Sequence, residues 1–293
     1  MIEQLSNGLV LGAVLAITSL GLSLLFSVTN SFSFAHGDLV TVGAVVAVVL
    51  SGASVGLPVW LAIVLACVLG ILLGLLLDRV MFRPMRRKGV GGITLLVTTL
   101  GLALIVRYVI LALVGPGSRA LPLEQQRVQT YLGLRLTPSA ALAIVLSVVV
   151  LVLVGVFLLC TSLGISMRAV ANNPQLAMAS GISVDRIVAI AWALSTGFAA
   201  FGGTIMALTQ LVYWDMGFHL LLLIFASVIL GGLGTAFGAM VGGFLIGIVT
   251  QLSVTLPFVR DHVDLKIAVG LGVMALVLLV RPQGLMGRAV RAS

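Results

Sequence analysis

The sequence predicts an all-α integral membrane protein, a polytopic bundle of about eight or nine transmembrane helices, some of them short or broken. Two observations predict this fold. Of the 293 residues, 61% are hydrophobic and only 8% are charged, whereas a typical soluble domain is about 25% charged. The mean hydropathy is +1.29, so the chain prefers a bilayer to water. Its length leaves no room for an added soluble domain, and residues 1–293 are predicted to form a single transmembrane domain.

Apolar runs mark the expected helices. A membrane-spanning helix needs roughly 20 mostly apolar residues. Runs of this kind lie near residues 5–29, 38–52, 58–81, 93–114, 138–160, 186–210, 217–231, 235–252 and 265–281. The runs at 38–52 and 217–231 are short for a full crossing, and broken helices occur only where they are packed in protein or line a cavity. The first two runs leave open whether the chain crosses eight or nine times.

The basic residues predict the orientation. One set of loops carries ten of them: Arg79, Arg83, Arg86, Arg87, Lys88, Arg168, Arg186, Arg281, Arg288 and Arg291. The opposite set carries five basic residues and four acidic ones: Arg119, Arg127, Arg135, Arg260, Lys266, Glu124, Asp215, Asp261 and Asp264. Cytoplasmic loops are richer in Lys and Arg, so the first set is predicted to be cytoplasmic, with the C-terminus. Nine crossings then place the N-terminus outside, and eight place it inside.

The net charge of +8 does not indicate a nucleic-acid partner, because the basic residues are spread over short loops next to membrane lipid. Several chemical motifs are missing from the sequence. The two lysines, Lys88 and Lys266, follow Arg87 and Leu265, so the Gly-Lys-Ser/Thr of a phosphate-binding loop does not occur. We find no paired carboxylates, metal-spaced His/Cys cluster or Gly-x-Ser-x-Gly elbow. No enzyme activity, metal or cofactor is therefore predicted.

A few charged residues lie inside or beside the apolar runs. Asp38 follows His36 at the start of a run, Arg107 lies within one, and Asp78 and Arg79 close another. Ionisable groups in a membrane span often mark an ion or proton relay. The alternatives are that Arg107 extends toward the interface or meets a helix end, that Asp38 caps a helix, and that Asp78 and Arg79 are interfacial. A secondary transporter that acts alone therefore stays open.

Glycines recur near the C-terminal third of the chain. Gly234, Gly238 and Gly242 are four residues apart and share one face of a helix. Small residues at this spacing let helix backbones approach closely. The alternative is that Gly231, Gly232 and Gly234 break the helix, so that the flanking runs line a path.

Two loops are long enough to hold structure. In the loop at 161–185, Asn173 is a good N-cap, Pro174 fits the first helical position, and Gly181 fits a left-handed stop. A short helix is predicted at 174–180, which either rests on the membrane interface or docks a cytoplasmic partner. In the opposite loop, the stretch 131–136 is predicted to form a small hairpin.

Four sequence blocks occur in order along nearly the whole chain. They are Gly12–Leu24 leading to Ser33-Phe34-Ala35-His36-Gly37-Asp38 and Gly43-Ala44; Arg168-Ala169 with Ala177 to Gly181-Ile182; Leu230-Gly231-Gly232-Leu233-Gly234-Thr235 with Gly238; and Arg281–Gly287. Together they resemble the permease family of branched-chain amino acid ABC importers, whose signature in the first block reads Asn-Phe-Ala-His-Gly.

The resemblance implies partners and site residues. Two such permeases, usually non-identical, form the path; two cytoplasmic ATPases bind the ATP, and a periplasmic or lipid-anchored binding protein delivers the solute. The predicted ATPase-coupling residues are Gly164, Arg168, Ala169, Asn173, Pro174, Ala177, Gly181 and Ile182, within a cytoplasmic coupling loop at 161–185. The predicted translocation-path residues are Ser33, Phe34, Ala35, His36, Gly37, Asp38, Gly231, Gly232 and Gly234.

The sequence departs from the family pattern at two positions near the predicted path. Ser33 stands where Asn is usual, and Leu15 stands where Tyr is common. The expected function is a permease subunit that moves branched-chain amino acids or a similar small polar solute across the inner (plasma) membrane. A urea or amide permease of the same family, a secondary transporter acting alone and a scaffold membrane protein stay open.

Overall fold

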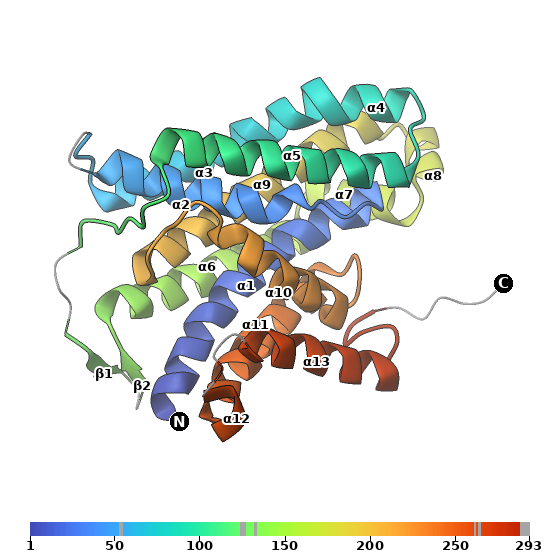
Figure 1. The fold of residues 1–293 in the computed structure, drawn as a ribbon. Coiled ribbons are helices and arrows are strands. Elements are labelled where there is room, and N and C mark those ends of the chain that lie inside the picture. The colour runs from blue at the N-terminus through green and yellow to red at the C-terminus, as the bar shows by residue number, and fades with distance from the viewer. Residues whose placement is uncertain (53–54, 124–126, 132–133, 261, 263–264, 288–293) are drawn as a thin grey trace.

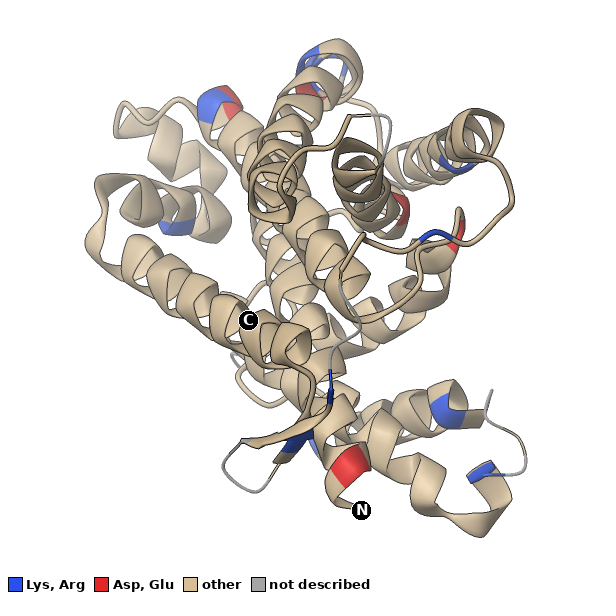
Figure 2. Ribbon diagram, turned by 90° about the vertical axis from the view of Figure 1, so that its left-hand side faces the viewer, with Lys and Arg blue, Asp and Glu red and all other residues tan. Residues whose placement is uncertain are grey.

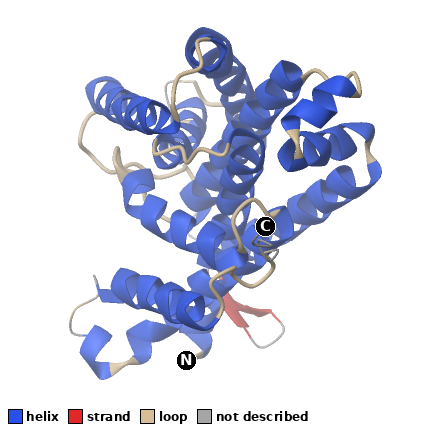
Figure 3. Cartoon of the chain, turned by 90° about the vertical axis from the view of Figure 1, so that its right-hand side faces the viewer, coloured by secondary structure: helices blue, strands red, loops and turns tan. Residues whose placement is uncertain are grey.

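The computed structural model describes residues 1–52, 55–123, 127–131, 134–260, 262 and 265–287. In this part of the chain, helices make up the whole architecture apart from one two-stranded hairpin (Figure 3). The nine long apolar helices are α1 (Ile2–Thr29), α2 (Ala35–Ser51), α3 (Val59–Leu77), α5 (Gly92–Val114), α6 (Pro138–Cys160), α9 (Val184–Thr209), α10 (Met216–Gly231), α11 (Ala236–Leu252) and α13 (Leu265–Val280). They correspond one to one to the nine apolar runs, which confirms the predicted fold class.

Shorter elements connect these helices. They are the π-helical turn η1 (Asp78–Phe82), α4 (Arg83–Arg87), β1 (Gln129–Tyr131), β2 (Leu134–Leu136), α7 (Ser162–Asn172), α8 (Pro174–Ala179), the 3-10 turn η2 (Ser253–Thr255) and α12 (Pro257–Arg260). Six of the described helical stretches are long and apolar enough to cross a membrane, while α2, α10 and α13 are shorter. The two runs that are short in the sequence are thus short helices in the structure, and α13 joins them.

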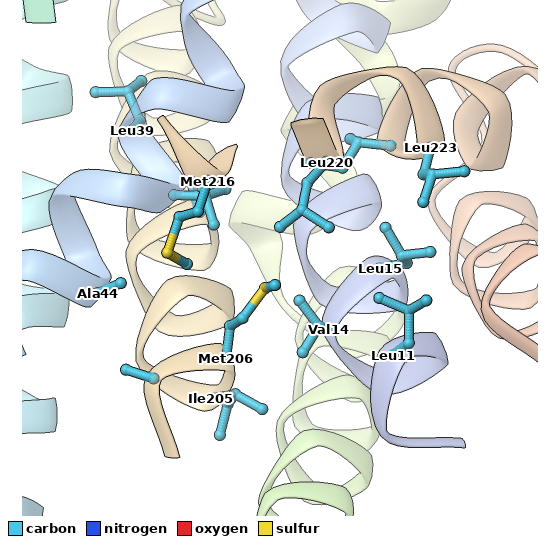
Figure 4. Packing of buried hydrophobic residues seen from close by; sticks show 14 of the residues in the cluster. Leu11, Val14, Leu15, Leu39, Ala44, Ile205, Met206, Met216, Leu220 and Leu223 are labelled. Atoms are coloured by element: carbon cyan, nitrogen blue, oxygen red, sulfur yellow. The ribbon is translucent and has the colours of Figure 1, made fainter. Parts of the chain in front are cut away.

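α1 is the central helix of the bundle. In its most apolar 18-residue window, 89% of the residues are buried, against 22% in α3 and in α5. Figure 4 shows Leu11, Val14 and Leu15 of α1 facing Leu220 and Leu223 of α10 across the core. The exposed faces of α3, α5 and α6 are also apolar. Apolar side chains on both the inside and the outside of a bundle are expected when the surrounding solvent is lipid.

Glycines allow α11 to pack closely on two neighbours. A Cβ atom at Gly238 would meet the carbonyl oxygen of Gly231 in α10, and one at Gly243 would meet the backbone of Ala16 in α1. Gly242 lies equally close to the carbonyl oxygen of Ser227 in α10. The glycine repeat therefore serves helix packing, as small residues do in membrane bundles.

The two ends of the bundle differ. At one end, which we call the hairpin end, β1 pairs antiparallel with β2, and Arg135 and Leu136 share a cleft with Glu3 of α1. This confirms the predicted hairpin, whose turn residues 132–133 lie outside the described residues. At the opposite end, which we call the α8 end, α4 and α8 lie at the upper right of the view, and the residues that follow α13 lie below them on the same side (Figure 1).

The residues that follow α13 show at which end of the bundle this helix finishes. Leu285 donates a backbone hydrogen bond to Leu230 at 2.8 Å, at the α8 end of α10. The first turn of α1 lies at the hairpin end, so the first helix starts and the last described residues lie at opposite ends of the bundle, an arrangement consistent with the nine-crossing alternative. Lys, Arg, Asp and Glu are sparse along the helices (Figure 2). Of the charged residues used to predict orientation, Glu124, Asp261, Asp264, Arg288 and Arg291 lie outside the described residues.

Candidate functional site

α2 begins inside the bundle. α1 ends at Thr29, and the next residue, Asn30, adopts the left-handed conformation (φ 51°, ψ 28°) and donates its N–H to the Phe26 carbonyl. Residues 31–34 then run without regular helix before α2 starts. His36 Nε2 lies 2.9 Å from the carbonyl oxygen of Thr18, about three turns back along α1. The chain therefore doubles back beside α1, and non-helical backbone lies within the bundle, where protein surrounds it.

The predicted path residues of the first block occupy this break and the first turn of α2. Ser33 and Phe34 lie in the break, and Ala35 to Asp38 follow in the helix. All of them are buried except Phe34, which is half-buried. His36 Nδ1 also lies 3.3 Å from Ser195 Oγ of α9. The single imidazole thus bridges α1, α2 and α9.

Asp38 forms an ion pair with Arg107 of α5. Arg107 Nε donates to Asp38 Oδ1 at 2.9 Å, and Arg107 Nη2 donates to Oδ2 at 3.1 Å. The side chain of Asp38 is fully buried and that of Arg107 is 12% exposed. The guanidinium carbon lies 4.0 Å from the ring centroid of Phe218 in α10. Two charges that the sequence presents as separate candidates therefore neutralise each other, with the bidentate geometry that arginine favours.

α10 crosses α2 at the same place. A Cβ atom at Gly37 would meet the carbonyl oxygen of Gly217, and Gly217 donates its N–H to Thr41 Oγ1 at 2.9 Å. The ring of Phe34 packs edge-on against Phe225, with centroids 5.4 Å apart. The start of one short helix is therefore packed directly on another short helix.

Gly231, Gly232 and Gly234 lie at the other end of α10, in its turn to α11. Gly232 (φ 108°) and Gly234 (φ 75°) adopt conformations that L side chains rarely take. The C-terminal tail covers this turn, because Met286 donates its N–H to the Gly231 carbonyl at 3.0 Å. These glycines break the helix as predicted, but the structure does not bring them together with Ser33 to Asp38. Their part in a path stays a prediction.

A cavity of about 80 Å³ opens next to the start of α2. Its walls come from α1, the break, η1, α4, α5 and α9. The residues that line it are Leu25, Thr29, Ser31, Phe32, Ser33, Phe82, Arg86, Leu95, Thr99 and Trp192. Thr99 Oγ1 accepts a hydrogen bond from Phe34 N at 3.2 Å. Three wall atoms are buried without a hydrogen-bond partner among the described residues: Ser33 Oγ, Arg86 Nη2 and Trp192 Nε1. Of these three residues, only Ser33 is among the path residues predicted from the sequence.

The predicted helix of the 161–185 loop is α8, Pro174–Ala179. Asn173 Oδ1 accepts from Leu176 N at 3.0 Å, and Pro174 is the first helical residue. Gly181 has φ 83°, and Ile182 donates its N–H to the Ala177 carbonyl at 3.0 Å, which closes the helix in a Schellman arrangement. The start and the glycine stop are both confirmed.

The same loop holds a helix that the sequence reasoning missed. α7 begins after Thr161, whose Oγ1 accepts from Gly164 N at 3.1 Å. Thr161 is itself a good N-cap residue, and this signal was available in the sequence. The signal is hard to see because Thr161 directly follows the apolar run of α6, without a separating loop.

The predicted coupling residues divide by exposure. Gly164 and Ala177 are buried, and Ala169 and Ile182 are half-buried. Exposed to the outside are Arg168, Asn173, Pro174 and Gly181. Large apolar side chains are exposed on the same two helices, namely Leu163, Ile165, Leu176 and Met178. The pair α7 and α8 therefore presents a mixed apolar and basic surface at one end of the bundle.

Ion pairs connect this loop to α4. Arg83 Nε and Arg87 Nη2 lie 3.2 and 3.1 Å from Asp185 Oδ2, at the start of α9. Arg86 Nη1 lies 2.7 Å from Asp78 Oδ1, in the π-helical turn. π-helical turns are rare and occur frequently at functional sites. The arginines of α4 thus contact both the end of the loop and the wall of the cavity.

Other potentially reactive side chains are scattered through the bundle. Within the described residues, no group of three or more His, Cys, Asp or Glu side chains could hold a metal ion. Cys67 and Cys160 are free thiols. Near the hairpin end, burial and the neighbouring charge of Asp215 raise the pKa of the Tyr213 hydroxyl. These groups form no reactive constellation with one another.

Short helices that meet inside a helical membrane bundle, next to a buried ion pair, are typical of membrane transporters. Residues 4–280 match the family described as "Branched-chain amino acid transport system / permease component". The chain belongs to this family.

Several relatives extend over nearly the whole chain. The chain is 25% identical to the high-affinity branched-chain amino acid transport system permease protein LivH of Escherichia coli (strain K12), over 98% of this chain and 96% of the relative. It is 30% identical to the probable branched-chain amino acid transport permease protein LivH of Methanocaldococcus jannaschii, over 97% and 91%. It is 28% identical to the high-affinity branched-chain amino acid transport system permease protein LivM of Escherichia coli (strain K12), over 53% of this chain and 37% of the relative. No solved structure matches this chain.

Proposed function

We propose that this protein is a permease subunit of an ABC importer that moves branched-chain amino acids, or a similar small polar solute, across the inner (plasma) membrane. The observation that carries the proposal is the family match over residues 4–280, together with relatives that match nearly the full length. The whole chain acts as one transmembrane domain.

The proposed assembly contains two cytoplasmic ATPases, a second permease and a periplasmic or lipid-anchored binding protein. A related but non-identical second permease is supported by the likeness of this chain to both LivH and LivM of one organism. ATP is bound by the partner ATPases, and this chain needs no cofactor of its own.

The loop at 161–185 is the proposed ATPase contact, on the cytoplasmic side. Supporting this are the exposed apolar side chains of Leu176 and Met178 beside the exposed Arg168. An exposed apolar surface with a polar rim is typical of a protein contact. The coupling residues are those predicted from the sequence. Residues 33–38, at the start of α2, are the proposed part of the translocation path.

Reconstitution tests the transport function. The chain, its second permease and the two ATPases are placed in liposomes with binding protein outside and ATP inside. We expect leucine uptake that requires ATP hydrolysis and the binding protein. Excess urea or acetamide is added as a competitor, and inhibition of leucine uptake by either compound would favour the amide-permease alternative. If the chain alone concentrates leucine in response to an ion gradient, the ABC proposal is wrong.

Two variants test the ATPase contact. Arg168→Glu and Gly181→Leu should reduce co-purification of the ATPases, because they reverse an exposed charge and strain a left-handed turn. Arg260→Glu is the charge-matched control, since Arg260 is exposed near the hairpin end. Gly101→Leu is the glycine control, since Gly101 is exposed with open space around it. Equal ATPase recovery from all four variants would remove the loop from the contact.

A further inference from the structure

We propose that the cavity beside the start of α2 binds the carboxylate group of the transported solute. This inference rests on the proposed transport function and adds a named binding site to it. The cavity-lining residues that carry the argument are Ser33, Arg86, Thr99 and Trp192.

The first argument is the donor chemistry of the wall. Trp192 and Ser33 are 3% and 2% exposed, and Trp192 Nε1 and Ser33 Oγ have no partner among the described residues. An indole N–H can only donate, and a hydroxyl can donate as well as accept. A buried donor without a partner is costly. The wall is therefore suited to a group with oxygen acceptors.

The second argument is charge. Arg86 Nη1 is satisfied by Asp78, but Nη2 is buried without a hydrogen bond and lies 3.9 Å from Asp185 Oδ1. One half of the guanidinium is thus held in place while the other half remains available to a ligand. The N-terminus of α2, which carries a partial positive charge, lies beside the same cavity because Ser33 and Phe34 precede it. Both features favour an anionic oxygen over a neutral one.

The third argument is shape. The cavity volume of about 80 Å³ exceeds the roughly 10–15 Å³ that one water molecule requires. The wall also contains the apolar side chains of Leu25, Phe82 and Leu95. A few polar groups in a mostly apolar pocket are typical of small-molecule sites. The combination fits a carboxylate attached to an aliphatic chain, which is the chemistry of the proposed solutes.

Fluorescence of Trp192 tests the site directly. The chain has three tryptophans, so Trp60→Phe and Trp214→Phe leave Trp192 as the single reporter in the full chain, held in lipid nanodiscs. Leucine and 4-methylpentanoate share a carboxylate and should change the emission saturably. Leucinamide, which lacks the carboxylate, should act at least about tenfold more weakly, because a hydrogen bond to a charged group is lost. Sodium chloride is the control that shows whether any simple anion changes the emission.

Equal responses to leucine and leucinamide, or a response to chloride alone, would overturn the carboxylate site. A cavity that holds only water would give no saturable response to any of these compounds and would also overturn it. Binding of labelled leucine to the unaltered chain checks that the tryptophan replacements have not disturbed the pocket.

Variants locate the binding within the cavity. Ser33→Ala should weaken leucine binding about tenfold, through the loss of one hydrogen bond to a charged group. Trp192→Phe should do the same while keeping the stacking on Phe82, whose ring centroid lies 4.3 Å away. Ser23→Ala is the matched control, because Ser23 Oγ is also buried without a partner but Ser23 does not line the cavity. Unchanged binding in Ser33→Ala and Trp192→Phe would overturn the assignment.

The assembled importer separates this inference from the proposed function. If the reconstituted transporter takes up leucine with ATP, and neither Ser33→Ala nor Trp192→Phe changes the KM, the cavity is not the site although the function stands. If no uptake occurs but Trp192 responds to carboxylates, the transport proposal fails and the binding site remains.

Discussion

Asp38 and Asp185 each contact arginine at about the same distance, yet they lie in very different surroundings. Asp38 is fully buried in the bundle, and its partner Arg107 is 12% exposed. Asp185 is 38% exposed at the α8 end, and its partners Arg83 and Arg87 are 38% and 63% exposed. Charges removed from water depend on their partner, whereas water can replace a partner at the surface. The first pair therefore fixes how α2 and α5 pack, and the second depends less on its partner because water reaches both of its sides.

The largest effect should come from breaking the buried pair. Asp38→Asn leaves the Arg107 charge unpaired inside the bundle and should lower the free energy of unfolding by about 3–5 kcal/mol. Reversible unfolding in detergent measures it. The double variant Asp38→Asn/Arg107→Gln should recover much of the loss, because no net charge remains. A single-variant cost below about 1 kcal/mol would show that water reaches this pair.

An intermediate effect is expected at Asp78. Its side chain is 2% exposed, and that of its partner Arg86 is 22% exposed. Asp78→Asn keeps the shape but removes the charge that holds Arg86, and should cost about 1–3 kcal/mol. The same unfolding measurement applies. A cost as large as that of Asp38→Asn would mean that Arg86 has no access to water in solution.

At Asp185 a small effect on stability is expected. Asp185→Asn should change the free energy of unfolding by less than about 1 kcal/mol, as for other exposed ion pairs. Asp215 is a half-buried acid near the hairpin end that pairs with His219. The change in the free energy of unfolding for Asp215→Asn is compared with that for Asp185→Asn. A loss of several kcal/mol at Asp185 would mean that the α4 contact is a fixed part of the fold.

Ionic strength should produce the smallest effect. Raising salt from 0.15 M to 1 M shortens the screening length from about 8 Å to about 3 Å. The difference between the unaltered chain and Asp185→Asn should then vanish, while the cost of Asp38→Asn should persist. Equal salt sensitivity of both variants would remove the distinction between the buried and the exposed pair.

Local signals predicted much of this molecule. The apolar runs correspond to the nine long helices, because in a bilayer the length and composition of a segment decide whether it spans. Asn173, Pro174 and Gly181 predicted the bounds of α8, since capping involves only neighbouring residues. Thr161 carried an equally local signal for the start of α7, and that signal was missed.

The site was less accessible to sequence reasoning. The 33–38 block marked a helix break, yet nothing in it shows that the chain doubles back to place His36 beside Thr18. Asp38 and Arg107 are 69 residues apart, so no spacing rule pairs them. Arg86 was assigned to a basic loop and Trp192 to an apolar helix, and only the packing of four helices and the break around one cavity brings them together.

By itself, the sequence determined that the chain belongs in a lipid bilayer, at which positions its nine apolar runs lie, and which family it resembles, because these depend on composition and on short contiguous blocks. The tertiary structure decided that the start of α1 and residues 285–287 lie at opposite ends of the bundle. It also decided that Gly238 and Gly242 serve packing, and that Asp38 has a partner. The physical reason is the same each time: pairing and close approach depend on which helices lie side by side, and residues far apart in the chain set that arrangement together.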